Sequence, residues 1–177
     1  AIDTAAPGSA IYVAGHSFSN ASVSTLRSHY VWTNKALTIM GGYAADGGSP
    51  GALTNMPTIL TSTAGSTNRI LYISGLTNGR LQRVTLRGGK GSSSGVGGAI
   101  NGSGLYIEAS SNLTVESCVV SNNFATGQQG STTYGGGVYL IGSEVRMTDC
   151  RVVSNTVNAY NTPTYGGGIH LASGSLM

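Results

Sequence analysis

The sequence predicts an all-β chain folded as a parallel β-helix, with three short strands in each coil of 31–34 residues. Two observations favour this fold. An apolar and glycine pattern recurs at a nearly constant spacing, and within each repeat apolar residues alternate at period two, which is the period of a strand. A third observation excludes the main alternatives: charged residues make up only 8% of the chain, and the scarcity of strong helix formers argues against a coiled coil or a helix bundle.

The repeat is plainest near the C-terminus. The segment 133–140, TYGGGVYL, returns 31 residues later at 164–171 as TYGGGIHL. A second pattern of Leu, Val, Cys, Val and Asn at 113–123 returns 32 residues later at 145–155, with Val and Met in its first two places. An earlier copy begins at Leu81. Each strand is therefore expected to pair with the strand one coil away, as in stacked repeats.

The clearest coil places strands at 105–107, 113–115 and 118–120, followed by a variable loop at 124–134. Alternation turns one set of apolar side chains inward, and stacking coils bury an area that no single coil could bury. The expected inward columns are Leu71, Leu105, Val138 and Ile169; Ile73, Ile107, Leu140 and Leu171; Val84, Cys118 and Cys150; and Leu86, Val120 and Val152.

Two pairs at equivalent positions of successive coils carry polar or reactive groups. Asn123 and Asn155 fall at the same corner of successive coils, where their amides can bond to the backbone and to each other as a ladder, with Gly89 at that corner one coil earlier. Cys118 and Cys150 lie about 4.8 Å apart at Cα, inside the range of a disulfide. Parallel side chains place the Cβ atoms slightly too far apart for an ideal bridge, so we expect a free, buried thiol pair.

The N-terminal third is less regular. Strands are expected at 11–13, 37–39 and 58–60, whereas the intervening segments fit no coil spacing and 21–32 reads as a short helix or a loop. We therefore divide the chain into an irregular first coil and cap, residues 1–60, and regular coils, residues 61–177, the last of them incomplete.

The C-terminal end should expose an open strand edge. After the strand at 169–171, the next strand is expected near Leu176, and the sequence stops at Met177. Open edges invite pairing with another chain. We expect either that this is the N-terminal part of a longer β-helix or that a neighbouring molecule supplies the missing strands head to tail, which would build a filament.

The repeats resemble those of a known family. Gly97-Gly98-Ala99-Ile100 matches the GGA-[I/L/V] motif of chlamydial polymorphic outer-membrane proteins, and 135–138 and 166–169 are close variants. The second family motif, F-x-x-N, is absent after Phe124. The resemblance to these bacterial cell-surface repeat proteins implies a right-handed parallel β-helix and leaves the activity open, because the fold hosts adhesins, structural fibres and polysaccharide enzymes.

Residues for catalysis or metal binding are sparse. Glu116 and Asp149 are the acids expected nearest to each other on adjacent coils, and the neighbouring Arg146 and Arg151 favour a solvated ion pair over a catalytic pair. We predict no catalytic residue, no metal site and no cofactor. Nine basic residues against six acidic ones form no dense basic face, so no nucleic-acid partner is expected, and no apolar run is long enough for a transmembrane helix.

Aromatic side chains form the one candidate contact face. Tyr72, Tyr106, Tyr139 and His170 lie between inward residues and should stack on the outside of one sheet, with Tyr12 extending the column. A second pair, Tyr134 and Tyr165, lies beside the glycines. The column either stabilises the sheet as a ladder or offers a flat strip to sugar rings or to another protein surface.

Low charge and an abundance of Ser, Thr, Asn and Gly suggest a secreted or cell-surface protein. The leading functional prediction is a non-catalytic structural or adhesive β-helix that associates with itself through its open ends. The alternative is a polysaccharide-binding or polysaccharide-cleaving domain. Partners under these two predictions are a second copy, another surface protein or a carbohydrate.

Overall fold

The computed structural model describes residues 2–20, 27–46, 49–63, 67–92, 101–127, 132–159 and 162–177. These residues form strands, turns and loops without a helix, and the pairing between strands is parallel except for one antiparallel pair. The chain is therefore all-β, as predicted. The GGA motif at 97–100 lies outside the described residues.

Three sheets make up the body. The first contains β1 (Ala10–Ala14), β4 (Thr38–Asp46), β8 (Arg80–Gln82), β12 (Leu113–Glu116), β17 (Ser143–Thr148) and β22 (Gly174–Leu176), with β5 (Ser49–Leu53) antiparallel to β4. The second contains β2 (Ser17–Asn20), β6 (Thr58–Ser62), β9 (Val84–Arg87), β13 (Val119–Ser121) and β18 (Arg151–Val153). The third contains β3 (Ser28–Thr33), β7 (Arg69–Ser74), β11 (Leu105–Glu108), β16 (Val138–Ile141) and β21 (Ile169–Leu171).

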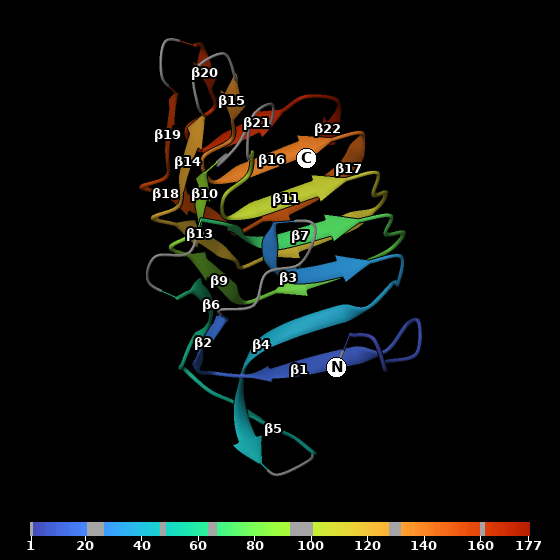
Figure 1. Cartoon of the computed structure of the whole chain (residues 1–177). Coiled ribbons are helices and arrows are strands. Elements are labelled where there is room, and N and C mark those ends of the chain that lie inside the picture. The colour runs from blue at the N-terminus through green and yellow to red at the C-terminus, as the bar shows by residue number, and fades with distance from the viewer. Residues whose placement is uncertain are drawn as a thin grey trace.

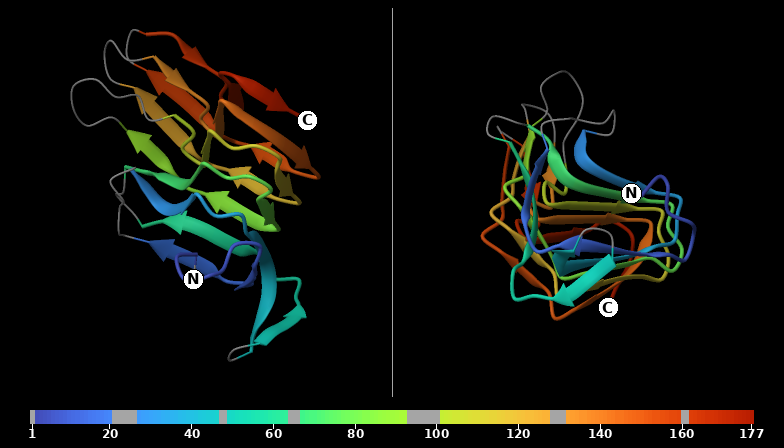
Figure 2. Two further views of the ribbon diagram at one scale, coloured as in Figure 1. Left: turned by 90° about the vertical axis from the view of Figure 1, so that its right-hand side faces the viewer. Right: turned by 90° about the horizontal axis from the view of Figure 1, so that it is seen from below.

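Two smaller sheets lie between the second and third. One contains β10 (Lys90–Ser92), β14 (Phe124–Gly127) and β19 (Thr156–Ala159), and the other β15 (Thr133–Tyr134) and β20 (Thr164–Tyr165). The chain visits the first, second and third sheets in the same order each time, and we call one such circuit a pass. Figure 1 shows the passes stacked from the blue N-terminal strands to the red C-terminal strands, and the end-on view in Figure 2 shows them overlaid around a common interior.

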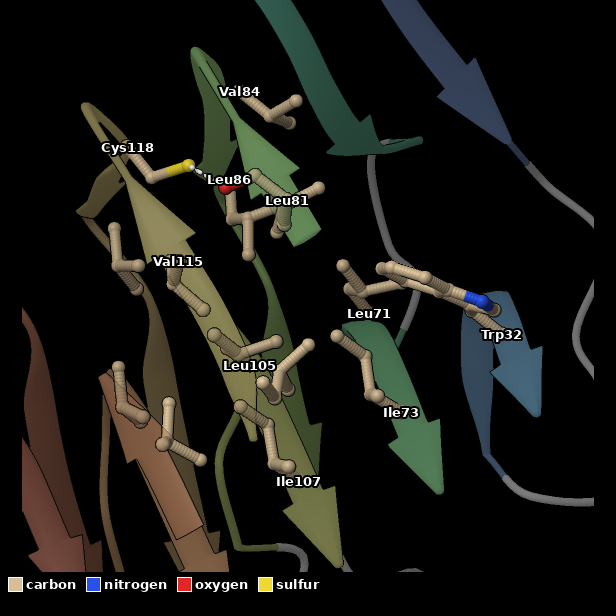
Figure 3. Packing of buried hydrophobic residues seen from close by; sticks show 14 of the residues in the cluster. Trp32, Leu71, Ile73, Leu81, Val84, Leu86, Leu105, Ile107, Val115 and Cys118 are labelled. Atoms are coloured by element: carbon tan, nitrogen blue, oxygen red, sulfur yellow. Dashed lines mark hydrogen bonds between the residues drawn. The ribbon is translucent and has the colours of Figure 1, made fainter. Parts of the chain in front are cut away.

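The predicted register is confirmed. Leu105 pairs with Leu71 on one side and with Val138 on the other, and Val120 lies between Leu86 and Val152. The strand expected near Leu176 is β22, in which Leu176 pairs with Val145. The inward columns meet in one core, where Leu105, Ile107 and Val115 are fully buried (Figure 3), whereas Leu171 on the last strand is exposed and does not join the core as predicted.

Several expectations for the loops and the N-terminal third are wrong. The helix or loop expected at 21–32 is contradicted over its described part by β3, which pairs with β7, and β2 pairs with β6 although 14–36 fitted no coil spacing. The loop expected at 124–134 contains β14 and β15. The strands β2, β3 and β14 were missed because their own sequences do not repeat the apolar pattern, whereas β15 lies in the repeated segment 133–140 but is only two residues long. The division of the chain at residue 60 stays a prediction.

Sharp corners join the sheets through residues in the left-handed backbone region. Between the first and second sheets this residue is Arg83, Ser117 or Asp149 in successive passes, and Gly42 takes the same conformation within β4. Between the third and first sheets it is Asn34, Gly75, Ala109 or Gly142. Because a left-handed residue costs a non-glycine side chain about 1–2 kcal/mol, the surrounding pairing must hold these corners in place.

Candidate functional site

The aromatic column forms on the outer face of the third sheet. The register places Tyr72, Tyr106, Tyr139 and His170 side by side on β7, β11, β16 and β21. Successive ring centroids are 5.4, 5.2 and 5.6 Å apart, and the rings are nearly parallel. The four predicted members therefore stack as expected.

Tyr12 does not belong to this column, so that part of the prediction is wrong. It lies on β1 in the first sheet and meets Tyr43 edge to face at 4.8 Å. On the third sheet the position before Tyr72 is Val31. The sequence did not show to which sheet Tyr12 belongs, because the repeat cannot be recognised between β1 and β7.

The column is also less open than a flat outer strip would be. Tyr72 and Tyr139 are each only 7% exposed, and burial raises the pKa of both phenols. The buried Arg69 guanidinium lies 4.3 Å from the centre of the Tyr106 ring, which is a cation–π distance, and burial lowers the pKa of Arg69. The alternation of inward and outward residues predicts that these rings point outward, but it does not show whether other side chains cover them.

Glu108 ties the start of this column together. The Tyr72 hydroxyl donates to Glu108 Oε1, and the Tyr106 hydroxyl donates to Glu108 Oε2 at 3.1 Å. Burial, followed by the charge of Glu108 and this hydrogen bond, raises the pKa of Tyr106 well above its usual range. The phenols therefore stay protonated as donors at neutral pH, and Glu108 acts here as an acceptor within the sheet.

At the C-terminal end of the column, a groove opens between two aromatic rows. Tyr134 stacks on Tyr165 at 5.5 Å, as predicted, and lies 4.5 Å from the His170 ring. The groove holds about 500 Å³ and is lined by Tyr134, Tyr139, Tyr165, His170, Leu171 and Ala172. Tyr165 is 49% exposed, and burial lowers the pKa of His170, so its imidazole is neutral at neutral pH. The groove offers ring faces, hydroxyls and a neutral imidazole.

The asparagine ladder forms at the expected corner. Asn123 Nδ2 donates to Asn155 Oδ1 at 2.9 Å and to the Leu86 carbonyl at 3.1 Å, while the Gly89 N–H donates to Asn123 Oδ1 at 2.8 Å. Asn155 Nδ2 repeats the pattern with the carbonyl of Val120. Asn123 is buried, so these bonds satisfy polar groups that have no access to water.

A second ladder, of serines, was missed by sequence reasoning. Ser110 Oγ accepts the Leu76 N–H at 3.2 Å, and Ser143 Oγ accepts the Ser110 N–H at 3.1 Å. Both serines are buried at the corner between the third and first sheets. The 33-residue spacing between them was available in the sequence, but serine is so frequent in the chain that the pair did not stand out.

The expected ion pair has a different partner. Glu116 pairs with Arg80 on the preceding strand β8, in place of Arg146 or Arg151, and Asp149 lies exposed at a corner. Parallel register places Arg80 and Arg146 on opposite sides of Thr114, each diagonal to Glu116, and the ion pair forms with Arg80. Asp149 directly follows Thr148, the register partner of Glu116, so the two acids lie on adjacent passes as predicted, and only the ion pair of Glu116 differs from the expectation.

The two cysteines are free thiols at facing positions on adjacent passes, with Cys118 buried and Cys150 half-buried. Within the described ranges, no three side chains among His, Cys, Asp and Glu gather in a way that could hold a metal ion. No helix with the length and apolar character needed to span a bilayer occurs in the described part of the chain.

Comparison of the chain with protein-family models, with curated proteins and with solved structures finds no match. The resemblance to chlamydial polymorphic outer-membrane repeats therefore stays a prediction. What the chain does has to be inferred from its own strands, ladders and grooves.

Proposed function

We propose that the chain is a right-handed parallel β-helix whose passes are the coils of a solenoid. The supporting observation is the fixed order in which the chain visits three parallel sheets, with each strand in register with the strand one pass away. The handedness follows from the general rule that crossover connections between parallel strands are right-handed in about 98% of cases.

The function that this architecture supports best is a structural or adhesive element of a secreted or cell-surface protein, without catalytic activity. The carrying observation is that the regular positions serve stacking: Glu108 bonds to two tyrosines, Glu116 pairs with Arg80, and Asn123 and Asn155 join the passes. Low charge also leaves little electrostatic repulsion between copies of the chain.

End-to-end association is part of this proposal. The strands β18, β21 and β22 each stand last in their sheets, and β1, β2 and β3 stand at the opposite ends. Val153 and Leu171, both on the last strands, are exposed apolar residues. A second copy placed head to tail would continue all three sheets and cover these side chains.

Sedimentation velocity and electron microscopy of the 177-residue chain test this association. We expect concentration-dependent growth into linear assemblies, and we expect the double substitution Val153→Lys and Leu171→Lys to reduce it. Phe124→Lys is the matched control, because Phe124 is exposed but lies on β14, which is paired on both sides. A chain that stays monomeric at high concentration, or a control that dissociates equally, contradicts end-to-end stacking.

One observation favours a second function, polysaccharide binding. The groove beside Tyr134, Tyr165 and His170 combines ring faces with polar edges, as sugar sites do, and its neutral imidazole suits an uncharged sugar. Calorimetry with neutral oligosaccharides would then detect binding that Tyr165→Ala weakens about tenfold or more. Tyr12→Ala, at an exposed tyrosine on another sheet, is the control. Cleavage of the polymer that is lost on Glu116→Gln would instead show an enzyme.

A further inference from the structure

The two cysteines are brought together by the parallel register of the second sheet. Val119 pairs with Arg151, and the Arg151 N–H donates to the Cys118 carbonyl at 2.9 Å. On the other side, the Ser117 N–H donates to the Thr148 carbonyl at 2.9 Å. Cys118 and Cys150 therefore occupy facing positions, with Cα atoms about one strand spacing, ~4.8 Å, apart, within the range of a disulfide.

Their surroundings differ although their positions are equivalent. Cys118 is buried in the core, where its sulfur points toward the Leu81 carbonyl (Figure 3), while Cys150 is half-buried. Both thiols also lie close to the carbonyl two residues before them, at 3.3 Å in each case. The two side chains lie close enough to affect each other's pKa. A small reagent can therefore approach Cys150 more easily than Cys118.

This proximity affects the pKa values of the two thiols unequally. The interaction with Cys118 lowers the pKa of Cys150 to about 7, although burial and the nearby charge of Asp149 oppose this. The interaction with Cys150, together with burial, raises the pKa of Cys118. Cys150 is thus the thiol that supplies a thiolate near neutral pH, and the thiolate is the reactive form of cysteine.

We propose that Cys150 and Cys118 form a reversible thiol–disulfide site, with Cys150 as the attacking thiol and Cys118 as the resolving thiol. The co-reactant is a low-molecular-weight disulfide, RSSR. The Cys150 thiolate attacks one sulfur of RSSR, the S–S bond breaks, RS⁻ leaves, and a mixed disulfide remains on Cys150. Cys118 then loses its proton to solvent and attacks Cys150 Sγ, which releases the second RS⁻. The two thiols are oxidised to one disulfide, and RSSR is reduced to two RSH after protonation.

This bridge would join two adjacent passes covalently. Side chains that project in parallel from neighbouring strands depart from ideal disulfide geometry, and strained disulfides are the more readily reduced ones. The site would therefore switch with the thiol–disulfide balance of its surroundings: oxidation links the two passes covalently just before β13 and β18, and reduction leaves them held by noncovalent contacts such as the pairing of these strands. The bridge depends on the observed register, and access to Cys150, which directly precedes the last strand β18, requires that no second copy covers that end.

The test treats the reduced 177-residue chain with oxidised glutathione, followed by acid quenching, intact mass measurement and peptide mapping. The wild-type chain should lose the mass of two hydrogen atoms and yield one cross-linked peptide containing Cys118 and Cys150. Cys118→Ser should stop at a glutathione adduct on Cys150, and Cys150→Ser should react about tenfold more slowly. Oxidation should raise the thermal midpoint of the wild type by about 5 °C or more, and dithiothreitol should reverse the rise.

A measurement on the wild type alone guards against variants that fail to fold. Brief alkylation with iodoacetamide should label Cys150 before Cys118. Four outcomes overturn the proposal: faster labelling of Cys118, stable glutathione adducts on both residues without a bridge, a disulfide between two chains, or a wild-type chain that stays reduced.

Discussion

The C-terminal passes and the N-terminal passes are joined by different kinds of contact. From β9 to β19 the same side chain recurs at the same corner, so Asn123 bonds to Asn155 and Ser110 to Ser143. Between β1 and β6 each contact occurs once. The Thr58 hydroxyl accepts the Gly42 N–H at 2.8 Å and donates to the Ala14 carbonyl at 2.7 Å, and the Tyr30 hydroxyl donates to the Phe18 carbonyl.

This difference shows to what extent the passes need a repeated sequence in order to stack. A ladder satisfies backbone groups in several passes with one residue type, whereas single contacts satisfy them one by one with unrelated residues. Both kinds give parallel strands in register. Pairing of the backbone therefore does not require a repeated sequence, provided that each buried polar group finds some partner.

Removing the asparagine ladder should have the largest effect on the free energy of unfolding. Asn123→Ala leaves the Gly89 N–H and the Leu86 carbonyl without their buried partner, so we expect the free energy of unfolding to fall by about 3 kcal/mol. Chemical denaturation followed by circular dichroism measures this. Asn158→Ala, at an exposed position on β19, should change stability by less than about 0.5 kcal/mol. Equal losses at both positions would show that the ladder contributes nothing particular.

Alanine substitution of Gly137, which lies beside the asparagine ladder, should have the second-largest effect on stability. A Cβ on Gly137 would lie 2.7 Å from Asn155 Nδ2 and 2.7 Å from the Gly168 carbonyl oxygen, so Gly137→Ala should cost about 2 kcal/mol through overpacking. At Gly142 the added Cβ meets open space, and only its left-handed backbone opposes alanine. Gly142→Ala should therefore cost about 1 kcal/mol. The reverse order in denaturation midpoints would contradict close approach at the ladder.

Loss of a single contact at the N-terminal end should destabilise the structure only near that contact. Thr58→Val keeps the side-chain shape and removes the hydroxyl between Gly42 and Ala14, with an expected cost of about 1–2 kcal/mol. Hydrogen exchange at the Gly42 amide should accelerate strongly, while exchange at Gly89 stays unchanged. Thr61→Val, at a half-buried position on the same strand, is the control. Faster exchange across the whole chain would mean that the N-terminal contacts are not local.

Substitutions in the aromatic column should have the smallest effect on stability at neutral pH, and this effect should increase at alkaline pH. Because the pKa of Tyr106 is raised in the folded chain, its contribution is complete below the ordinary tyrosine pKa of about 10 and is lost as pH rises above it. Tyr106→Phe should therefore flatten the alkaline loss of stability. Thermal midpoints measured between neutral and alkaline pH decide this, and parallel curves for wild type and Tyr106→Phe would refute it.

The sequence by itself determined the features that repeat regularly. The columns through Leu105 and Val120, the asparagine ladder and the membership of the stacked rings from Tyr72 to His170 all follow from a constant spacing combined with period-two alternation. This works because equivalent residues in stacked strands must be neighbours, so spacing along the chain translates directly into contact.

Only the tertiary structure decided the features that do not repeat. The strands β2 and β3, the pairing of Glu116 with Arg80 and the burial of Tyr72 depend on what happens to lie beside them in space. The same holds for the unequal cysteines, since Cys118 and Cys150 occupy equivalent positions in the repeat but differ in burial and proton affinity. Periodicity specifies which residues are equivalent, whereas burial and charge depend on neighbours that differ from one pass to the next.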